Sequence, residues 1–145
     1  MSWPVDRGVA SSLLEAYRGT EFRVADRGWS FVLRVDQASP VLAACHEAFG
    51  VTRSAYFTAW NPRSEPQTCE VNAAAQAQLE ADLAELGLPF LRGEGVDPTG
   101  AWPSEASVLV LGIAEENARR LGRRHGQDAI VVAGRDAVAR LVMLV

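Results

Sequence analysis

The spacing of apolar and polar residues divides the chain into short helical and extended segments. A helical repeat of apolar residues over 11–17 predicts a short helix that ends at Gly19. Apolar and polar residues then alternate over 20–25 and again over 29–35, with the turn-forming run Asp26-Arg27-Gly28 between them. The N-terminal part therefore predicts one helix followed by a β-hairpin.

A second helix and an aromatic strand come next. Ser39 and Pro40 offer an N-cap and a first-turn proline, and apolar residues recur at helical spacing until Gly50. Residues 54–60 are rich in aromatic and small residues and predict a strand. It ends at Asn61-Pro62, because proline has no N–H to donate to a neighbouring strand.

The longest predicted helix follows that strand and ends at Gly87. Ser64 and Thr68 are rival N-caps, since both precede the apolar repeat at suitable distances. The repeat predicts a buried stripe along one face of the helix. Its members are Val71, Ala75, Leu79, Leu83 and Leu86.

The remainder of the chain predicts strands around one more helix. That helix ends at Gly126 and has acidic residues in its first turn and arginines later, which suits the helix dipole. The predicted segments are a strand at 88–91, a loop rich in Gly and Pro at 93–104, a buried strand at 108–111, the helix at 114–125, and strands at 129–132 and 141–145.

From Ser54 to Ala133 the order is strand, helix, strand, strand, helix, strand. This is the split βαβ order of ferredoxin-like folds, in which right-handed crossovers place both helices on one face of the sheet. We therefore expect an α+β fold in one domain, residues 1–145, with a mixed β-sheet extended by the N-terminal helix and hairpin. An open, mostly parallel α/β sheet is the alternative, because the helix at 39–49 also needs a surface to pack on.

Composition excludes several kinds of enzyme. The 145 residues are 48% hydrophobic and 22% charged, as in an ordinary globular domain. All fourteen cationic residues are Arg, and the chain has no Lys. Schiff-base and pyridoxal-phosphate enzymes, Walker-type nucleotide sites and kinases need a Lys ammonium, so these classes are excluded. Arginine still recognises phosphate or carboxylate, so anionic ligands stay open.

Charge and hydropathy bear on partners and location. The net charge of −4 argues against duplex nucleic acid and anionic membranes as partners. No apolar run approaches the ~18 residues of a membrane span, and the start Met1–Arg7 has no signal-peptide pattern. We expect a cytoplasmic protein whose two cysteines, Cys45 and Cys69, are thiols. A protein partner or homo-oligomer is left open.

Trp60, Asn61 and Arg63 are the first candidates for ligand binding. They follow a predicted strand, where folds commonly present their functional loops. Asn offers both donors and acceptors, and Arg offers a planar fork for carboxylate or phosphate. The alternative is a capped turn in which Trp60 belongs to the core.

Glu94, Asp97 and Glu105 are three carboxylates around one predicted loop. They could supply an acid and a base or bind a hard cation such as magnesium, although carboxylates in loops are usually only solvated. Glu105 is the first choice, because it lies just before a buried strand. Apart from magnesium, no cofactor or metal site is predicted. The Gly93-Glu94-Gly95 run is interpreted as a turn, since it lacks the third glycine of a dinucleotide motif.

His125 and Gln127 flank Gly126 at a predicted helix-to-strand junction. His125 could be a general base, or it could cap the helix end. Cys69 could be an activated thiolate at a helix start, but a small buried thiol is the favoured interpretation. Two His residues and no Cys-x-x-Cys pair make a zinc site unexpected.

Several of these residues also carry a resemblance. The chain resembles a bacterial family known as domain of unknown function 3293, from about Tyr17 to Ile130. The resemblance rests on Thr58–Pro62, on Asn72 in the long helix, on Gly93–Gly95 with Asp97, on Trp102-Pro103 with Glu105 and Ser107, and on Gly126-Gln127 with Ala129 and Ile130. It implies that these pieces form one unit, which adds Asn72 to the candidate ligand-binding residues, and it implies no activity.

The leading hypothesis is a small protein that binds, and could turn over, a polar molecule of anionic or nucleotide-like character. Asn61, Arg63, Glu94, Asp97, Glu105 and Gln127 would converge on that molecule. A second hypothesis is a non-catalytic regulatory or protein-interaction module with Trp60 and Trp102 as anchors. A third makes the arginines of 119–124 an RNA contact.

Overall fold

The computed structural model describes the backbone of residues 10–145 and the side chains from Leu14 onward. Met1–Arg7, where no signal pattern was found, lies outside the described residues. In chain order the elements are α1 (Ala10–Arg18), β1 (Glu21–Asp26), β2 (Trp29–Leu33), α2 (Pro40–Ala48), β3 (Ser54–Phe57), the 3₁₀ turn η1 (Pro62–Ser64), α3 (Cys69–Glu85), β4 (Phe90–Val96), β5 (Glu105–Leu111), α4 (Glu115–Arg124), β6 (Ala129–Ala133) and β7 (Arg140–Met143).

The strands form one seven-stranded sheet in the order β2-β1-β4-β5-β3-β6-β7. The stretch β4-β5-β3-β6 is the strand order of a ferredoxin-like fold, so the predicted α+β class and split βαβ order are confirmed. The pairings between the named strands are all antiparallel, where a mixed sheet was predicted. The reason is that the two strands joined by each helix are not neighbours. β3 and β4 are separated by β5, and β5 and β6 are separated by β3, and each intervening strand runs antiparallel to both.

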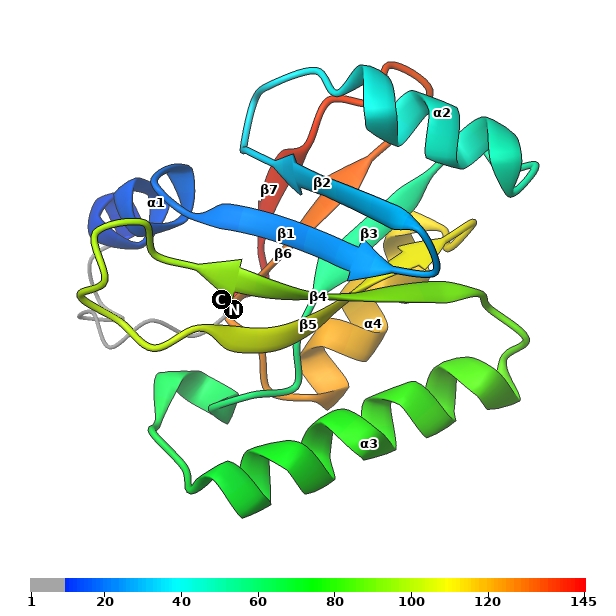
Figure 1. Cartoon of the computed structure of the whole chain (residues 1–145). Coiled ribbons are helices and arrows are strands. Elements are labelled where there is room, and N and C mark those ends of the chain that lie inside the picture. Colours follow the sequence, from blue (N-terminus) through cyan, green and yellow to red (C-terminus); the bar gives the residue numbers. More distant parts are fainter. Residues whose placement is uncertain (1–9) are drawn as a thin grey trace.

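Helices α3 and α4 pack on the same face of the sheet, as the split order predicts (Figure 1). Leu79 and Leu83 of α3 and Leu121 of α4 belong to one buried cluster with Phe57 and Ile130 of the sheet. This surface is called the α3–α4 face below.

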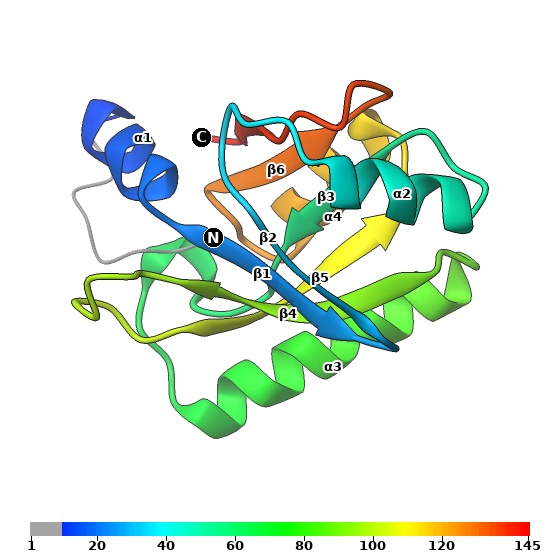
Figure 2. The same ribbon diagram turned by 45° about the horizontal axis from the view of Figure 1, so that its top comes forward.

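The opposite face is covered by α1 and α2 (Figure 2). Tyr17 of α1 and Leu42 and Cys45 of α2 pack with Phe22 and Tyr56 of the sheet. The alternative of a mostly parallel open sheet is wrong, because the pairings are antiparallel. That alternative did correctly expect a second face for the helix at 39–49. This helix is α2, and it packs on the face opposite α3 and α4, which is called the α1–α2 face below.

Segments beyond the two edge strands approach each other. The backbone N–H of Asp36 donates to Ala139 O at 2.7 Å, that of Ser39 donates to Ala137 O at 3.0 Å, and an isolated bridge pairs Ala38 with Val138. The curled sheet is therefore tied between the end of β2 and the start of β7.

The predicted loop at 93–104 is in part a strand, because β4 runs to Val96. Gly93 pairs with Val24 of β1, and a Cβ on Gly93 would lie 1.8 Å from Arg23 O. Neither Gly93 nor Gly95 has positive φ. Gly93 thus permits the close approach of two strands, and the turn interpretation is wrong.

The buried stripe of α3 also differs from the prediction. Val71 and Leu86 are 50% and 58% exposed, whereas Asn72 and Gln76 are buried together with Leu79 and Leu83. Thr68 is the N-cap, and its hydroxyl accepts from Val71 N at 3.1 Å. The N-terminal half of α3 therefore buries amides, and their partners lie in the loop that follows β3.

Candidate functional site

Most of the buried polar residues gather at the end of β3, around residues 58–64, which we call the β3 loop. They come from the loop itself, from α3, from the start of β5 and from the junction between α4 and β6. They are Thr58, Asn72, Gln76, Glu105, Ser107, Gln127 and Asp128, each 7% exposed or less. Because buried polar groups destabilise a fold unless they are bonded, such a concentration marks the region as a candidate site.

Asn61 and Asn72 form a reciprocal amide pair. Asn61 N donates to Asn72 Oδ1 at 2.9 Å, and Asn72 Nδ2 donates to Asn61 Oδ1 at 2.9 Å. Asn61 Oδ1 also accepts from Gln67 N at 3.0 Å. The pair fixes the β3 loop to the first turn of α3, so these two predicted residues are brought together and act as supports of the loop.

Gln76 continues this support one turn further along α3. Its Oε1 accepts from Ala59 N at 2.9 Å and lies 3.3 Å from Thr58 Oγ1. The Thr58 hydroxyl donates to Ala106 O at 2.5 Å, which ties the loop to β5. Sequence reasoning missed Gln76. The available signal was its position four residues after Asn72, on the same side of the helix.

The junction between α4 and β6 forms the other wall of the β3 loop. Gln127 Nε2 donates to Trp60 O at 3.1 Å and to His125 O at 3.2 Å. Arg63 N donates to Gly126 O at 2.7 Å, and the Ser64 hydroxyl is hydrogen bonded to the Asp128 carboxylate. Trp60, Arg63 and Gln127 are therefore neighbours, as predicted.

The backbone of the β3 loop is strained. Asn61, Arg63 and Ser64 have φ values of 46°, 58° and 60°, in the left-handed region that L-residues other than Asn and Asp rarely adopt. Arg63 and Ser64, which are neither Asn nor Gly, each cost about 1–2 kcal/mol. The surrounding hydrogen bonds hold this conformation, and the Arg63 side chain is exposed.

Glu105 and Glu94 lie on opposite faces of the sheet. Glu105 pairs with Gly95 and is 5% exposed, and strand alternation places it on the α1–α2 face with Ser107 and Leu109. Glu94 is exposed and alternates with Gly93 and Gly95 onto the other face. Glu105 is thus next in sequence to Ala106, whose carbonyl oxygen contacts the β3 loop. Glu94 is not brought to the β3 loop.

Asp97 holds its own turn. Its carboxylate accepts from Thr99 N at 2.9 Å, from the Thr99 hydroxyl at 2.8 Å and from Ala101 N at 3.1 Å. These bonds, with the Thr99 hydroxyl first, lower the pKa of Asp97. The position of the Asp97 carboxylate is therefore explained by hydrogen bonds within its own turn.

His125 faces α3. Its Nε2 lies 3.0 Å from Asp82 Oδ2, and hydrogen bonds from Gln78 and then from His125 lower the pKa of Asp82. His125 also occupies the C-cap of α4. The contact joins the two helices of the α3–α4 face, so the imidazole faces Asp82 and only the backbone N–H of His125 bonds the carbonyls at the end of α4.

The remaining candidates lie apart from one another. Trp60 and Trp102 are half-buried, and Trp102 packs against the core of the α1–α2 face. Cys69 is exposed at the first turn of α3, so its interpretation as a buried thiol is wrong, while burial raises the pKa of Cys45. Among residues 14–145 no three His, Cys, Asp or Glu side chains form a group that could hold a metal ion. Glu94, Asp97 and Glu105 therefore do not form such a group.

The β3 loop thus combines an exposed guanidinium, an indole and several amides in a fixed geometry, with one buried carboxylate on the adjacent strand. These are the groups that recognise polar ligands by hydrogen bonds and charge. Over the part of the chain that the structure describes, none of the helices is long and apolar enough to cross a bilayer.

Comparison with known proteins addresses whether these pieces belong together. Neither the curated proteins nor the solved structures gave a match to this chain. A family described as a protein of unknown function, DUF3293, matches residues 57–130. The matched range is shorter than the resemblance, which began at about Tyr17. It runs from the last residue of β3 to the second residue of β6, so it includes the whole β3 loop and the residues that surround it. Because the match spans half of the sequence and contains the candidate site, the chain belongs to the DUF3293 family.

Proposed function

We propose that this protein binds a small anionic molecule at the β3 loop, with nucleotide-like compounds as the first class to test. The observation that carries the proposal is the left-handed backbone at Arg63 and Ser64. Strain of this kind persists where the surrounding structure enforces it, and it concentrates at ligand sites. Here two buried amides and a helix-to-strand junction enforce it, and the residue presented is an arginine.

Each group has a role in this proposal. The Arg63 guanidinium contacts a phosphate or carboxylate through paired hydrogen bonds. Trp60 offers an aromatic surface beside a planar ring, and Gln127 contributes to the wall that orients the loop. If the ligand is turned over, Glu105 is the group we assign to proton transfer, because it is a buried carboxylate at the start of β5, whereas the buried Asp128 carboxylate is bonded to Ser64.

A thermal-shift screen against nucleotides, phosphosugars, amino acids and divalent metals tests the proposal. A ligand at a hundredfold excess over its Kd stabilises the folded state by about 2.7 kcal/mol, which raises the melting temperature by roughly 5–10 °C. Arg63→Gly removes the guanidinium and relieves the left-handed strain, so the variant stays folded and loses the shift. Glu105→Gln tests the carboxylate in the same way.

Arg135→Ala is the matched control, because Arg135 is also exposed and lies in another part of the chain. We expect it to keep the full shift. A ligand that stabilises Arg63→Gly as strongly as the natural chain would exclude the β3 loop as its site. Failure of every compound class to shift the natural chain would overturn the small-molecule proposal.

The interaction-module hypothesis requires Trp60 and Trp102 as exposed anchors. Both residues are half-buried, so this hypothesis is kept as the second candidate. A cytoplasmic location is part of the proposal, because Cys69 is an exposed free thiol, and reducing compartments keep such thiols reduced.

A further inference from the structure

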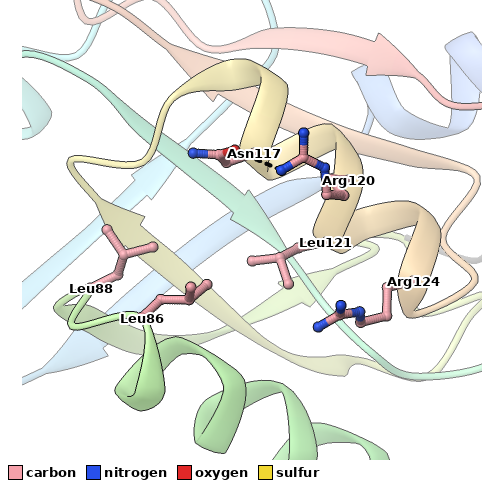
Figure 3. A pocket seen from close by; sticks show the side chains of 6 residues that line it. All are labelled: Leu86, Leu88, Asn117, Arg120, Leu121 and Arg124. Atoms are coloured by element: carbon pink, nitrogen blue, oxygen red, sulfur yellow. Dashed lines mark hydrogen bonds between the residues drawn. The ribbon is translucent and has the colours of Figure 1, made fainter.

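A groove lies between the end of α3 and the outer side of α4, separate from the β3 loop residues (Figure 3). Its volume is about 310 Å³, at the lower end of the range for small-molecule sites. Figure 3 shows Leu121 and Arg124 pointing from α4 toward the turn that carries Leu86 and Leu88. Asn117 and Arg120 complete the lining.

The apolar part of the groove includes Leu86, whose side chain stays exposed to solvent in the folded protein. Leu86 is 58% exposed at the C-cap of α3, just before Gly87 with φ of 69°. Leu88 N donates to Leu83 O at 3.0 Å, which fixes the turn and keeps Leu86 beside the groove. Leu88 and Leu121 continue the apolar surface inward. An aliphatic chain laid here would remove this surface from water.

Two guanidiniums accompany the leucines. Arg120 and Arg124 are four residues apart on α4, a spacing at which like charges repel. Among the described residues, the polar contacts of Arg120 are long, 3.3 Å to Asn117 Oδ1 and 3.7 Å to Glu116 Oε1. Arg119, which does not line the groove, holds Glu115 at 2.8 Å.

One acidic group near the groove, Asp82, is already engaged. Asp82 lies close enough to Arg124 to feel its charge, but its oxygens accept from Gln78 at 2.9 Å and contact His125 at 3.0 Å. The loosely held positive charge at this surface therefore belongs to Arg120 and Arg124. An anionic head placed between them would relieve their repulsion.

We infer that this groove binds a small amphipathic carboxylate, with its aliphatic chain on Leu86, Leu88 and Leu121 and its head between Arg120 and Arg124. Charge complementarity selects an anion, and the leucines select an apolar chain attached to it. RNA is disfavoured because Arg119 is paired with Glu115 and the groove is lined by three leucines. The site differs in place and chemistry from the β3 loop.

The test is a titration of the isotope-labelled full chain with octanoate, followed through the methyl resonances of Leu86, Leu88 and Leu121. Octanamide keeps the chain without the charge, octyltrimethylammonium reverses the charge, and acetate supplies the head alone. We expect octanoate to shift these methyls and to bind at least roughly tenfold more tightly than the other three, since a hydrogen bond to a charged group is worth about that much.

Arg120→Ala with Arg124→Ala should weaken octanoate binding by roughly tenfold or more. Arg123→Ala is the matched control, because Arg123 is exposed on the same helix and does not line the groove. It should change the affinity less than about twofold. All these positions are exposed, so the variants keep the fold, which their unchanged methyl spectra would verify.

The inference is overturned if octanoate shifts none of the three leucines. It is equally overturned if octyltrimethylammonium binds as well as octanoate, or if Arg123→Ala weakens binding as much as the double variant. Sedimentation that shows a second copy of the chain covering these leucines, or an acidic peptide that binds them while octanoate does not, would assign the groove to a protein partner instead.

Discussion

At the level of single residues, Gly93 and Gly95 share a strand and a face but meet different surroundings. A Cβ on Gly93 would lie 1.8 Å from Arg23 O, and the nearest atom to a Cβ on Gly95 is Ser107 Oγ at 3.9 Å. The first contact involves the backbone of β1 and cannot be relieved by a rotamer change. Only Gly93 is therefore required for the close approach of β1 and β4.

Gly93→Ala should reduce the free energy of unfolding by about 3 kcal/mol or more, because the strands must separate to admit the methyl group. Gly95→Ala, the control in the same strand, should change it by less than about 1 kcal/mol. Urea denaturation of both variants measures the difference. Equal stability of the two would show that β1 and β4 do not pack as described.

The candidate site could be predicted in part, because turn residues next to a strand are visible in a sequence. Asn61 and Gln127 were found in this way, while Asn72 came from the resemblance, and the structure brings the three together. Glu94 could not be excluded from the site, because the glycines around it suggest a loop and hide the strand that turns it to the opposite face. Asp97 and His125 have near partners that no sequence pattern reveals.

At the level of elements, α2 is held to the sheet by a buried polar contact. His46 Nε2 and Ser54 Oγ lie 2.8 Å apart, and both residues are at most 4% exposed. Burial lowers the pKa of His46, because the charged imidazolium is poorly solvated there. Protonation of His46 therefore opposes the packing of α2.

The stability of the protein should fall as the pH drops from about 6.5 toward 5. In the unfolded chain His46 binds a proton near its ordinary pKa of 6.5, while in the folded chain it binds one only at lower pH. The unfolded state thus takes up more protons in this range, and stability falls by at most about 1.4 kcal/mol per pH unit for one group. Carboxylates with lowered pKa values, such as Glu21 and Asp82, lose their contributions at more acidic pH.

His46→Gln is the variant that isolates this effect, because its amide can still bond to Ser54 and does not titrate. We expect its free energy of unfolding, measured by urea denaturation at several pH values, to vary less between pH 6.5 and 5 than that of the natural chain. An identical pH dependence in both proteins would show that His46 does not cause the loss.

The elements themselves could be predicted well where apolar spacing and end signals agree. The split order of strands and helices followed from spacing alone, since it depends on the sequence of elements and not on their exact ends. The buried face of α3 could not be predicted in the same way. Asn72 and Gln76 are buried because the β3 loop supplies their partners, and that loop reaches α3 only in the folded chain.

At the level of the whole molecule, the contacts between residues 36–39 and 137–139 join the two ends of the curled sheet. They bring the segment that follows β2, early in the chain, to the segment that precedes β7, near its end. Both segments include a left-handed residue, Asp36 with φ of 66° and Ala137 with φ of 53°. No pattern in the sequence indicated this pairing, because neither segment is a strand and each is only a few residues long.

Hydrogen exchange tests whether this closure is part of the stable core. Asp36 N and Ser39 N donate to Ala139 O and Ala137 O, and Ala137 and Ala139 are both buried. If the closure opens only when the sheet unfolds, these two amides should exchange as slowly as those of β5, the central strand of the sheet. The amides of Arg27 and Gly28, at the exposed turn between β1 and β2, are the fast-exchanging reference. Exchange of Asp36 and Ser39 at the rate of that turn would show that the two edges of the sheet are not joined.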